Sequence, residues 1–376
     1  MSAASQGHLP DPFAAWSALV KGIGGFEDTD RIRRGMLIHA TAPRPPVGRT
    51  PHTVIHTQNK LCVRFYAPAT DAHTQVPVIV VPSLINRAYI VDLEPDRSLV
   101  AGLADRGHPV YLVDWGVFGP EDGDVTVAHV VLDLLHRAVD RACRHAGASD
   151  AFLLGYCQGG TLAAMYAALR PRRVRGLAVF NAPFKFALGG RFRAFTDPES
   201  LDVDEAIPGE GLVPVEFMQV GFKMLDPVGS VTKYAAIEGA AGDPVRLART
   251  MARERWLEEN VPLPAPFARE FIRRTYQEDA LLAGTWELAG ERIDLQQIRC
   301  PLLVTAAERD FIAPPEAVLP LAEATGSDDV TAEVLRTGHI GVVVGSFGPR
   351  AFYPMLDRWF RARLPGQDSA PTAEAR

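Results

Sequence analysis

The chain has 376 residues, of which 47% are hydrophobic and 22% are charged, and its formal net charge is −6. This balance is typical of a globular domain, and a mildly acidic chain has no general electrostatic reason to bind nucleic acid or anionic membranes. Four scattered cysteines without CxxC spacing argue against a disulfide framework and against a zinc site. The sequence shows neither a secretory signal nor a run long enough to span a bilayer, so we expect a cytoplasmic protein.

Strand-like and helix-like segments alternate through most of the chain. Short, β-branched apolar runs predict strands buried on both faces, and apolar residues three and four apart predict helices. Such an alternation predicts an α/β fold, with a mostly parallel sheet covered by helices on both faces. The expected strands lie within residues 60–68, 76–86, 108–116, 150–156, 174–183, 300–310 and 330–341, and the expected helices span about 125–145, 159–171 and 349–364.

Breaks in this alternation suggest the organisation of the chain. Residues 1–47 are predicted to be a peripheral N-terminal segment, and 366–376 a disordered tail. The core is expected to combine residues 48–183 with 291–365. The segment between them, 184–290, is rich in helical patterns and is predicted to be an inserted cap that shapes substrate access.

The most informative segment is LLGYCQGGT, residues 153–161. It fits the pattern glycine-x-nucleophile-x-glycine, with Gly155, Cys157 and Gly159, between a predicted strand and a predicted helix. A nucleophile at such a turn sits on a strained backbone, where neighbouring side chains would clash. The turn aims the N-terminus of the helix at the sulfur, which favours a thiolate. The pattern therefore predicts an α/β-hydrolase fold with Cys157 as nucleophile.

An acid and a histidine must follow the nucleophile in that order. Asp310 comes directly after one predicted strand, and His339 comes after the next. Glu308 is the rival acid, two residues earlier. An unperturbed histidine, with a pKa of about 6.5, is suited to serve as the base.

Two backbone amides should stabilise the oxyanion. The Gln158 N–H, directly after the nucleophile, is predicted to be one donor. The second should come from the loop after the strand within residues 76–86, where Leu84 and Ile85 are the candidates.

With these residues identified, the segment from about residue 50 to residue 364 resembles the polyhydroxyalkanoate synthases, especially the short class III and class IV catalytic subunits. LINRAYIVDLEPDRSLV and GYCQGG carry the resemblance together. It implies an acyltransferase that polymerises (R)-3-hydroxyacyl-CoA into a growing polyester and releases CoA, without a metal or an organic cofactor. Cys157 then matches the family's nucleophile, His339 its base and Asp310 its acid, and Ile85 matches the position that supplies the loop oxyanion amide.

The resemblance also implies a separate accessory subunit and attachment to storage granules, and it leaves homodimer formation open. Phe311 departs from the family, which commonly has His or Tyr after the acid, and so does the segment VFNAPFKF. A thiol-dependent hydrolase of the same fold, either a polyester depolymerase or a thioesterase, remains the alternative function. A catalytically silent granule-binding protein is a third.

Two arginine clusters could bind the phosphates of CoA. The alternative for both is an ordinary solvated charged face. The clusters consist of Arg170, Arg172, Arg173 and Arg175, and of Arg191 and Arg193.

Overall fold

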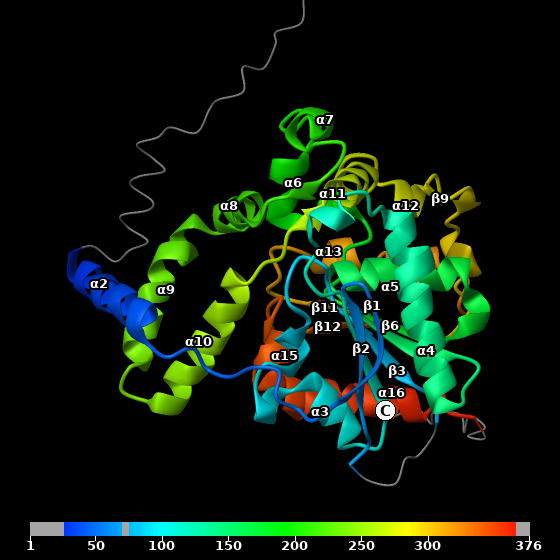
Figure 1. Ribbon diagram of the computed structural model, residues 1–376, viewed down its shortest axis with the longest axis horizontal. Helices are drawn as coiled ribbons and strands as arrows, with labels where there is room; N and C mark the ends of the chain where they lie inside the picture. The colour runs from blue at the N-terminus through cyan, green and yellow to red at the C-terminus, as the bar shows by residue number, and fades with distance from the viewer. Residues whose placement is uncertain (1–25, 70–74, 366–376) are drawn as a thin grey trace, which may run out of the picture. The chain divides into compact units, whose positions relative to one another are not determined.

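An eight-stranded sheet is the main feature of the fold (Figure 1). The structure is a computed structural model that describes residues 26–69 and 75–365, so the predicted tail lies outside it. The first three strands in the spatial order, β1, β2 and β4, pair antiparallel, and every other pair is parallel. The order is β1 (Thr53–Gln58), β2 (Leu61–Tyr66), β4 (Val110–Asp114), β3 (Val78–Val81), β5 (Ala151–Tyr156), β6 (Val174–Phe180), β11 (Leu302–Ala307) and β12 (Val330–Leu335).

Helices cover both faces of this sheet (Figure 1). Phe152 of β5 contacts the aromatic rings of α16 (Tyr353–Arg361). Gly155 of the same strand lies against the first turn of α5 (Gln158–Leu169). Because successive side chains of a strand point to opposite faces, positions 152 and 155 belong to different faces. Helices α5 and α16 therefore lie on opposite sides of the sheet.

The central strands are buried along their whole length. Every residue of β3, β5 and β11 is buried, as the continuous apolar runs in the sequence predicted. Further helices of the core are α3 (Leu99–Ala104), α4 (His136–Ala146), α13 (Pro315–Val318), α14 (Leu321–Ala324) and α15 (Gly341–Val344). The predicted α/β-hydrolase fold class, with a mostly parallel sheet, is confirmed.

The described part of the chain falls into two compact units. One unit comprises residues 26–46 and 218–258, and the other contains the sheet and the remaining described residues. The predicted cap, residues 184–290, therefore contributes to both units. Within the sheet's unit the connection between β6 and β11 contains α6 (Gly190–Thr196), α7 (Val203–Ala206), β7 (Leu212–Val213), β8 (Leu263–Pro264), α11 (Ala265–Ile272), a π-helical turn (Arg273–Gln277), α12 (Ala280–Ala283), β9 (Glu287–Leu288) and β10 (Glu291–Arg292).

The smaller unit is helical. It contains α2 (Phe26–Thr41), α9 (Pro227–Ala240), α10 (Pro244–Glu258) and most of α8 (Val215–Leu225). Helices α2 and α9 cross closely, since a Cβ added at Gly35 would lie 1.8 Å from the Tyr234 carbonyl oxygen. Arg31 and Arg34 donate to the Glu238 carboxylate at 3.2 and 2.9 Å. The described part of the segment predicted as peripheral is thus packed against a helix from the middle of the chain.

Candidate active site

Cys157 stands at the sharp turn between β5 and α5. Its backbone has φ 53° and ψ −132°, a left-handed conformation that costs a non-glycine residue about 1–3 kcal/mol. The Cys157 amide donates to the carbonyl oxygen of Phe180, at the end of β6, at 3.1 Å. The thiol side chain is partly exposed, at the N-terminus of α5, where the helix dipole favours a negative charge. The structure thus places Cys157 at the strained turn between strand and helix where the sequence predicts a nucleophile.

The glycines of the motif allow strand and helix to approach closely. A Cβ at Gly155 would lie 2.4 Å from the Gly160 Cα atom. A Cβ at Gly159 would lie 2.1 Å from the Val81 carbonyl oxygen, at the end of β3. Both distances are far below van der Waals contact, so these positions require glycine to keep the turn in place.

Asp310 and His339 meet at the carboxyl edge of the sheet. They follow the neighbouring parallel strands β11 and β12, and His339 Nδ1 lies 2.6 Å from Asp310 Oδ2. The other carboxylate oxygen of Asp310 accepts the backbone N–H groups of Ile312 and Ala313, both at 2.9 Å. Asp310 is buried, whereas the rival Glu308 is exposed. The partner of the histidine is therefore Asp310.

The surroundings of His339 favour its protonated form. Burial alone would lower the pKa of the imidazole, but the Asp310 carboxylate and the Cys157 sulfur outweigh this and raise the pKa to about 10. The ordinary pKa of about 6.5 expected from the sequence is therefore wrong for this histidine. A protonated His339 near neutral pH stabilises a thiolate beside it.

The loop after β3 is tied to the side chain of Gln158. Its buried amide oxygen Oε1 accepts the Leu84 N–H at 3.1 Å and the Ser83 hydroxyl at 3.3 Å. The Ile85 N–H donates to Ser83 Oγ at 3.2 Å. Both candidate loop amides thus lie in one small network with the residue after the nucleophile. Ile85 and the Gln158 N–H remain predictions for the oxyanion donors.

Two residues that sequence reasoning missed hold the loop of His339. The Asn181 side chain donates to the His339 carbonyl oxygen at 2.6 Å, and the Tyr156 hydroxyl donates to it at 3.3 Å. Tyr156 precedes the nucleophile, but in the sequence it is simply the last apolar residue of a strand. Asn181 follows an apolar strand as many loop residues do, so only its neighbours in space identify it.

Most of the arginines considered for CoA face carboxylates. Pairing with acids neutralises them and supports an ordinary charged face: Arg170 with Glu291, Arg173 with Asp140, Arg175 with Asp150 and Arg193 with Asp197. The Arg191 guanidinium lies 4.8 Å from the ring centre of Phe311, next to Asp310. Of these arginines, Arg191 is placed beside the predicted site.

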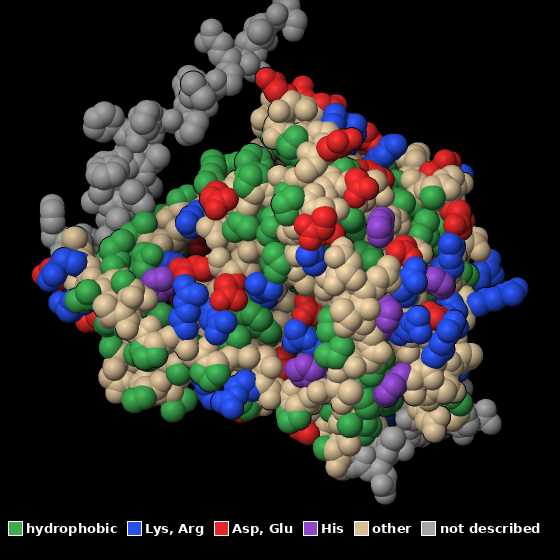
Figure 2. All heavy atoms as spheres, viewed as in Figure 1, with side chains coloured by type: hydrophobic (Ala, Val, Ile, Leu, Met, Phe, Trp, Pro, Cys, Tyr) green, Lys and Arg blue, Asp and Glu red, His purple; other side chains and the backbone are tan. Residues whose placement is uncertain are grey.

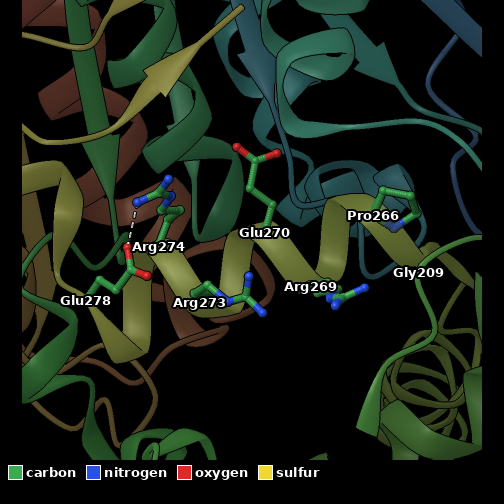
Figure 3. Close-up of a pocket in the computed structure, with 7 residues that line it drawn as sticks. All are labelled: Gly209, Pro266, Arg269, Glu270, Arg273, Arg274 and Glu278. Atoms are coloured by element: carbon green, nitrogen blue, oxygen red, sulfur yellow. Dashed lines mark hydrogen bonds and ion pairs between the residues drawn. The ribbon is translucent and has the colours of Figure 1, made fainter. Parts of the chain in front are cut away.

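A pocket of about 440 Å³ lies on the face of the α11 segment that carries Arg269 and Arg273 (Figure 3). In Figure 3 these two side chains point away from Glu270. Both contact the carboxylate of Asp204, and Arg274 pairs with Glu278 at 2.8 Å. The arginines of this pocket are matched by acids, so it offers no excess of positive charge for a phosphate. Its lining residues are Gly209, Pro266, Arg269, Glu270, Arg273, Arg274 and Glu278.

Comparison with known proteins agrees with this geometry. Residues 76–341 match the alpha/beta hydrolase fold family, and residues 45–103 match the N-terminus of poly-beta-hydroxybutyrate polymerase (PhaC). The chain is 34% identical to the poly(3-hydroxyalkanoate) polymerase subunit PhaC of Haloferax mediterranei, over 89% of this chain and 68% of that protein. It is 31% identical to the PhaC subunit of Allochromatium vinosum, over 89% of this chain and 94% of that one, and 30% identical to that of Synechocystis, over 84% and 86%. The chain therefore belongs to the family of poly(3-hydroxyalkanoate) polymerase PhaC subunits, built on the α/β-hydrolase fold.

Proposed function

We propose that this chain is a catalytic subunit that polymerises (R)-3-hydroxyacyl groups from CoA thioesters into polyhydroxyalkanoate through a covalent thioester on Cys157. The observation that carries the proposal is a cysteine at the strained elbow, beside the hydrogen-bonded pair of His339 and Asp310, in a PhaC-family chain. The reaction, as proposed, uses only groups of the chain itself. CoA thioester is the substrate, and no metal or organic cofactor takes part.

The first step transfers the acyl group to the enzyme. The Cys157 sulfur attacks the thioester carbonyl, and the oxyanion that forms accepts hydrogen bonds from the Gln158 amide and a loop amide, with Ile85 as the expected donor. The carbon–sulfur bond to CoA then breaks, and CoA leaves as a thiol with the proton of His339. One thioester replaces another, so the step involves no large change in free energy.

The second step forms the ester. A hydroxyl group of another acyl unit, or of the growing chain, attacks the Cys157 thioester and gives its proton to His339 Nε2. The carbon–sulfur bond breaks, an ester bond forms, and the cysteine returns as a thiolate beside a protonated histidine. The Asp310 carboxylate, which contributes to the raised pKa of His339, supports this role, because the imidazole must take a proton from a weakly acidic hydroxyl while Cys157 is acylated.

Arg191 is the residue we expect to contact the phosphates of CoA. It is exposed and lies against Phe311, so it stands beside the loop that carries Asp310. Replacing it in Arg191→Ala should raise KM for the CoA thioester severalfold and leave kcat nearly unchanged. An unchanged KM would remove Arg191 from the substrate site.

The partners and location follow the same proposal. We expect that the chain binds an accessory subunit and acts at the surface of storage granules. A homodimer remains an open alternative. Among the described residues, no helix is both long enough and apolar enough to cross a membrane.

One experiment tests the function directly. Purified protein is incubated with 3-hydroxybutyryl-CoA, and free CoA and insoluble polyester are measured in the same samples. The proposal expects both products to rise together, and intact-protein mass spectrometry to show an acyl adduct that Cys157→Ala lacks. Release of CoA with free 3-hydroxybutyrate and no polyester would instead indicate the thiol-dependent hydrolase.

A further inference from the structure

The short segment 180–183, directly after β6, holds the nucleophile in place. The Phe180 carbonyl oxygen accepts the backbone N–H of Cys157 at 3.1 Å. The Pro183 carbonyl oxygen accepts the side-chain hydroxyl of Thr161, in the first turn of α5, at 3.0 Å. Both ends of the segment are therefore bonded to the elbow and its helix.

The same segment also holds the loop of the histidine. Asn181 is fully buried, and its side-chain N–H donates to the carbonyl oxygen of His339 at 2.6 Å. The Asn181 backbone N–H donates to the carbonyl oxygen of Thr305, in β11, at 2.9 Å. This bond fixes the segment to the strand that leads to Asp310. His339 itself lies in the loop after β12, where no ladder hydrogen bonds constrain it. The contact from Asn181 supplies the shorter of the two side-chain bonds that hold its carbonyl oxygen, the other being the bond from the Tyr156 hydroxyl at 3.3 Å.

The arrangement is unfavourable for stability by itself. Asn181 adopts a left-handed φ of 50°, and its buried side-chain oxygen has no hydrogen-bond partner among the described residues. A strained backbone and an unsatisfied buried acceptor each destabilise a fold, and such features concentrate where a site requires them. Asparagine tolerates a positive φ and also carries a short side chain with an N–H donor. A larger residue would tolerate this backbone less well, and an apolar residue would lack the donor.

We propose that Asn181 is a positioning residue, which fixes His339 relative to Cys157 by using segment 180–183 as their common support. The inference rests on the proposed function, since the imidazole must first give a proton to the leaving CoA and then take one from an acceptor hydroxyl. Loss of the contact would leave His339 bonded to Asp310, with only the longer bond from the Tyr156 hydroxyl on its carbonyl oxygen, so its loop would be held less firmly. Small displacements of a base lower the rate of the chemical step more than they weaken substrate binding.

The test compares Asn181→Gly with a matched control, Asn59→Gly. Asn59 also has a left-handed φ, of 49°, and its side-chain amide also donates to a single partner, Asp122. It lies between β1 and β2, at the opposite edge of the sheet from β12. Glycine fits both backbones, so each variant loses one side-chain hydrogen bond and gains no backbone strain.

Two readouts are measured on both variants. The first is the rate at which iodoacetamide alkylates Cys157, measured by peptide mass spectrometry at several pH values from acidic to mildly alkaline. Because iodoacetamide reacts with thiolates, this rate reports how well the imidazole stabilises the thiolate. The second is kcat and KM with 3-hydroxybutyryl-CoA. We expect Asn181→Gly to be alkylated about tenfold more slowly at neutral pH, with kcat about tenfold lower and KM little changed. Asn59→Gly should match the unmodified protein in both.

The outcomes separate this inference from the function itself. Asn181→Gly behaving like Asn59→Gly in alkylation and in kcat would overturn the positioning role. If the protein makes no polyester at all, the proposed function fails, but the alkylation comparison still decides the role of Asn181. Should Asn181→Gly not fold, Asn181→Ala keeps a Cβ at this position and removes the donor without adding a charge. It is expected to show the same slow alkylation, and normal alkylation there would equally overturn the proposal.

Discussion

The imidazole of His339 is the residue on which opposing physical effects meet most clearly. Burial disfavours its charge, while the adjacent carboxylate and sulfur favour it, and the electrostatic attraction prevails. The pKa of His339 is therefore set by the two side chains beside it and lies above its ordinary value. Changing each of these side chains in turn should have a different, measurable effect.

The raised pKa of His339 makes stability depend on pH. Between about 6.5, the usual value, and about 10, the folded state holds a proton that the unfolded chain releases, so stability falls as pH rises through this window. The difference in unfolding free energy between the protein and His339→Gln should be largest below about pH 6.5 and should shrink towards pH 10. Urea titrations at several pH values measure it. In a Cys157→Ala background the pH range over which stability falls should narrow, because the sulfur no longer raises the pKa of His339. A difference that stays constant with pH would contradict this account.

Asp310→Asn should separate the two steps of the reaction. The side-chain oxygen of the introduced asparagine would keep accepting the Ile312 and Ala313 amides, so its NH2 group would face His339 Nδ1. His339 would then be neutral with its proton on Nε2, so it can hydrogen-bond to the leaving CoA sulfur but cannot accept a proton from a hydroxyl. Acylation can still proceed, because Cys157 can lose its proton to water and CoA can leave as a thiolate that takes a proton from water. We expect one early release of CoA, an acyl adduct on the protein and little polyester in a rapid-quench assay, whereas His339→Ala should lose both phases. Absence of any acyl adduct in Asp310→Asn would mean that the carboxylate is needed from the first step.

Substitutions of Cys157 should separate chemistry from backbone strain. Alanine shares the strained conformation of the cysteine, whereas glycine adopts it freely. Cys157→Ala and Cys157→Gly should both be inactive, and the glycine variant should be more stable than the alanine variant by about 1 kcal/mol. Cys157→Ser should lose most activity, since its hydroxyl is poorly ionised near neutral pH. Thermal unfolding and CoA release measure both properties, and an active alanine variant would refute the role of the sulfur.

The elbow between β5 and α5 shows how single elements set the site. The strand is buried throughout, and the helix begins immediately after the nucleophile. Close approach of α5 to the ends of β3 and β5 brings the Gln158 side chain to the loop that is expected to complete the oxyanion site. The position of this helix therefore controls the nucleophile and the loop together.

Gly159→Ala tests that close approach. Its new methyl group would lie 2.1 Å from the Val81 carbonyl oxygen, a backbone atom that cannot rotate away. We expect α5 to be displaced, with a loss of roughly 2 kcal/mol or more in unfolding free energy and little activity. Gly221→Ala is the control, because a Cβ in α8 at that position has nothing within 4 Å and alanine favours a helix. Equal stability of both variants in denaturant titrations would show that the elbow is looser than the distances indicate.

At the scale of the whole molecule, the smaller helical unit carries several exposed apolar side chains. Several large apolar side chains of this unit are exposed, and apolar patches are visible among the charged groups on the face shown in Figure 2. Contiguous apolar surface is commonly covered by a partner. The exposed large apolar residues in the described part of this unit are Met36, Leu37, Val220, Met224, Val245 and Leu257.

We predict that an accessory subunit activates the chain through this surface. Leu37 and Val245, 63% and 61% exposed, are the positions to change, since polar residues there remove apolar area without opening the core. Leu37→Ser and Val245→Ser should weaken activation by the subunit severalfold, and the single-turnover acylation of Cys157 should be unchanged. Polymerisation rates measured against subunit concentration give the comparison. An isolated chain with full activity, no lag and no response to the subunit would refute the prediction.

The sequence by itself determined the features that local pattern controls. Continuous apolar runs predicted the buried strands, and the glycines around Cys157 predicted the elbow, because a strained turn between a buried strand and a helix tolerates few other residues. The position of Asp310 and His339 after successive strands predicted their meeting, since the carboxyl ends of neighbouring parallel strands lie at one edge of a sheet. Their roles in catalysis remain predictions.

Only the tertiary structure decided what depends on contacts between distant segments. The clamp from Asn181 onto His339 joins residues 158 positions apart, and nothing in the local sequence distinguishes that asparagine from a loop residue. The pKa of His339 depends on its burial and on its distances from a carboxylate and a sulfur atom. These quantities cannot be read from the spacing of residues along the sequence. Likewise, helix α2 belongs to the segment that the sequence predicted to be peripheral, but it packs on α9 within a compact unit. Helices pack where their surfaces are complementary, whether or not they are close along the chain.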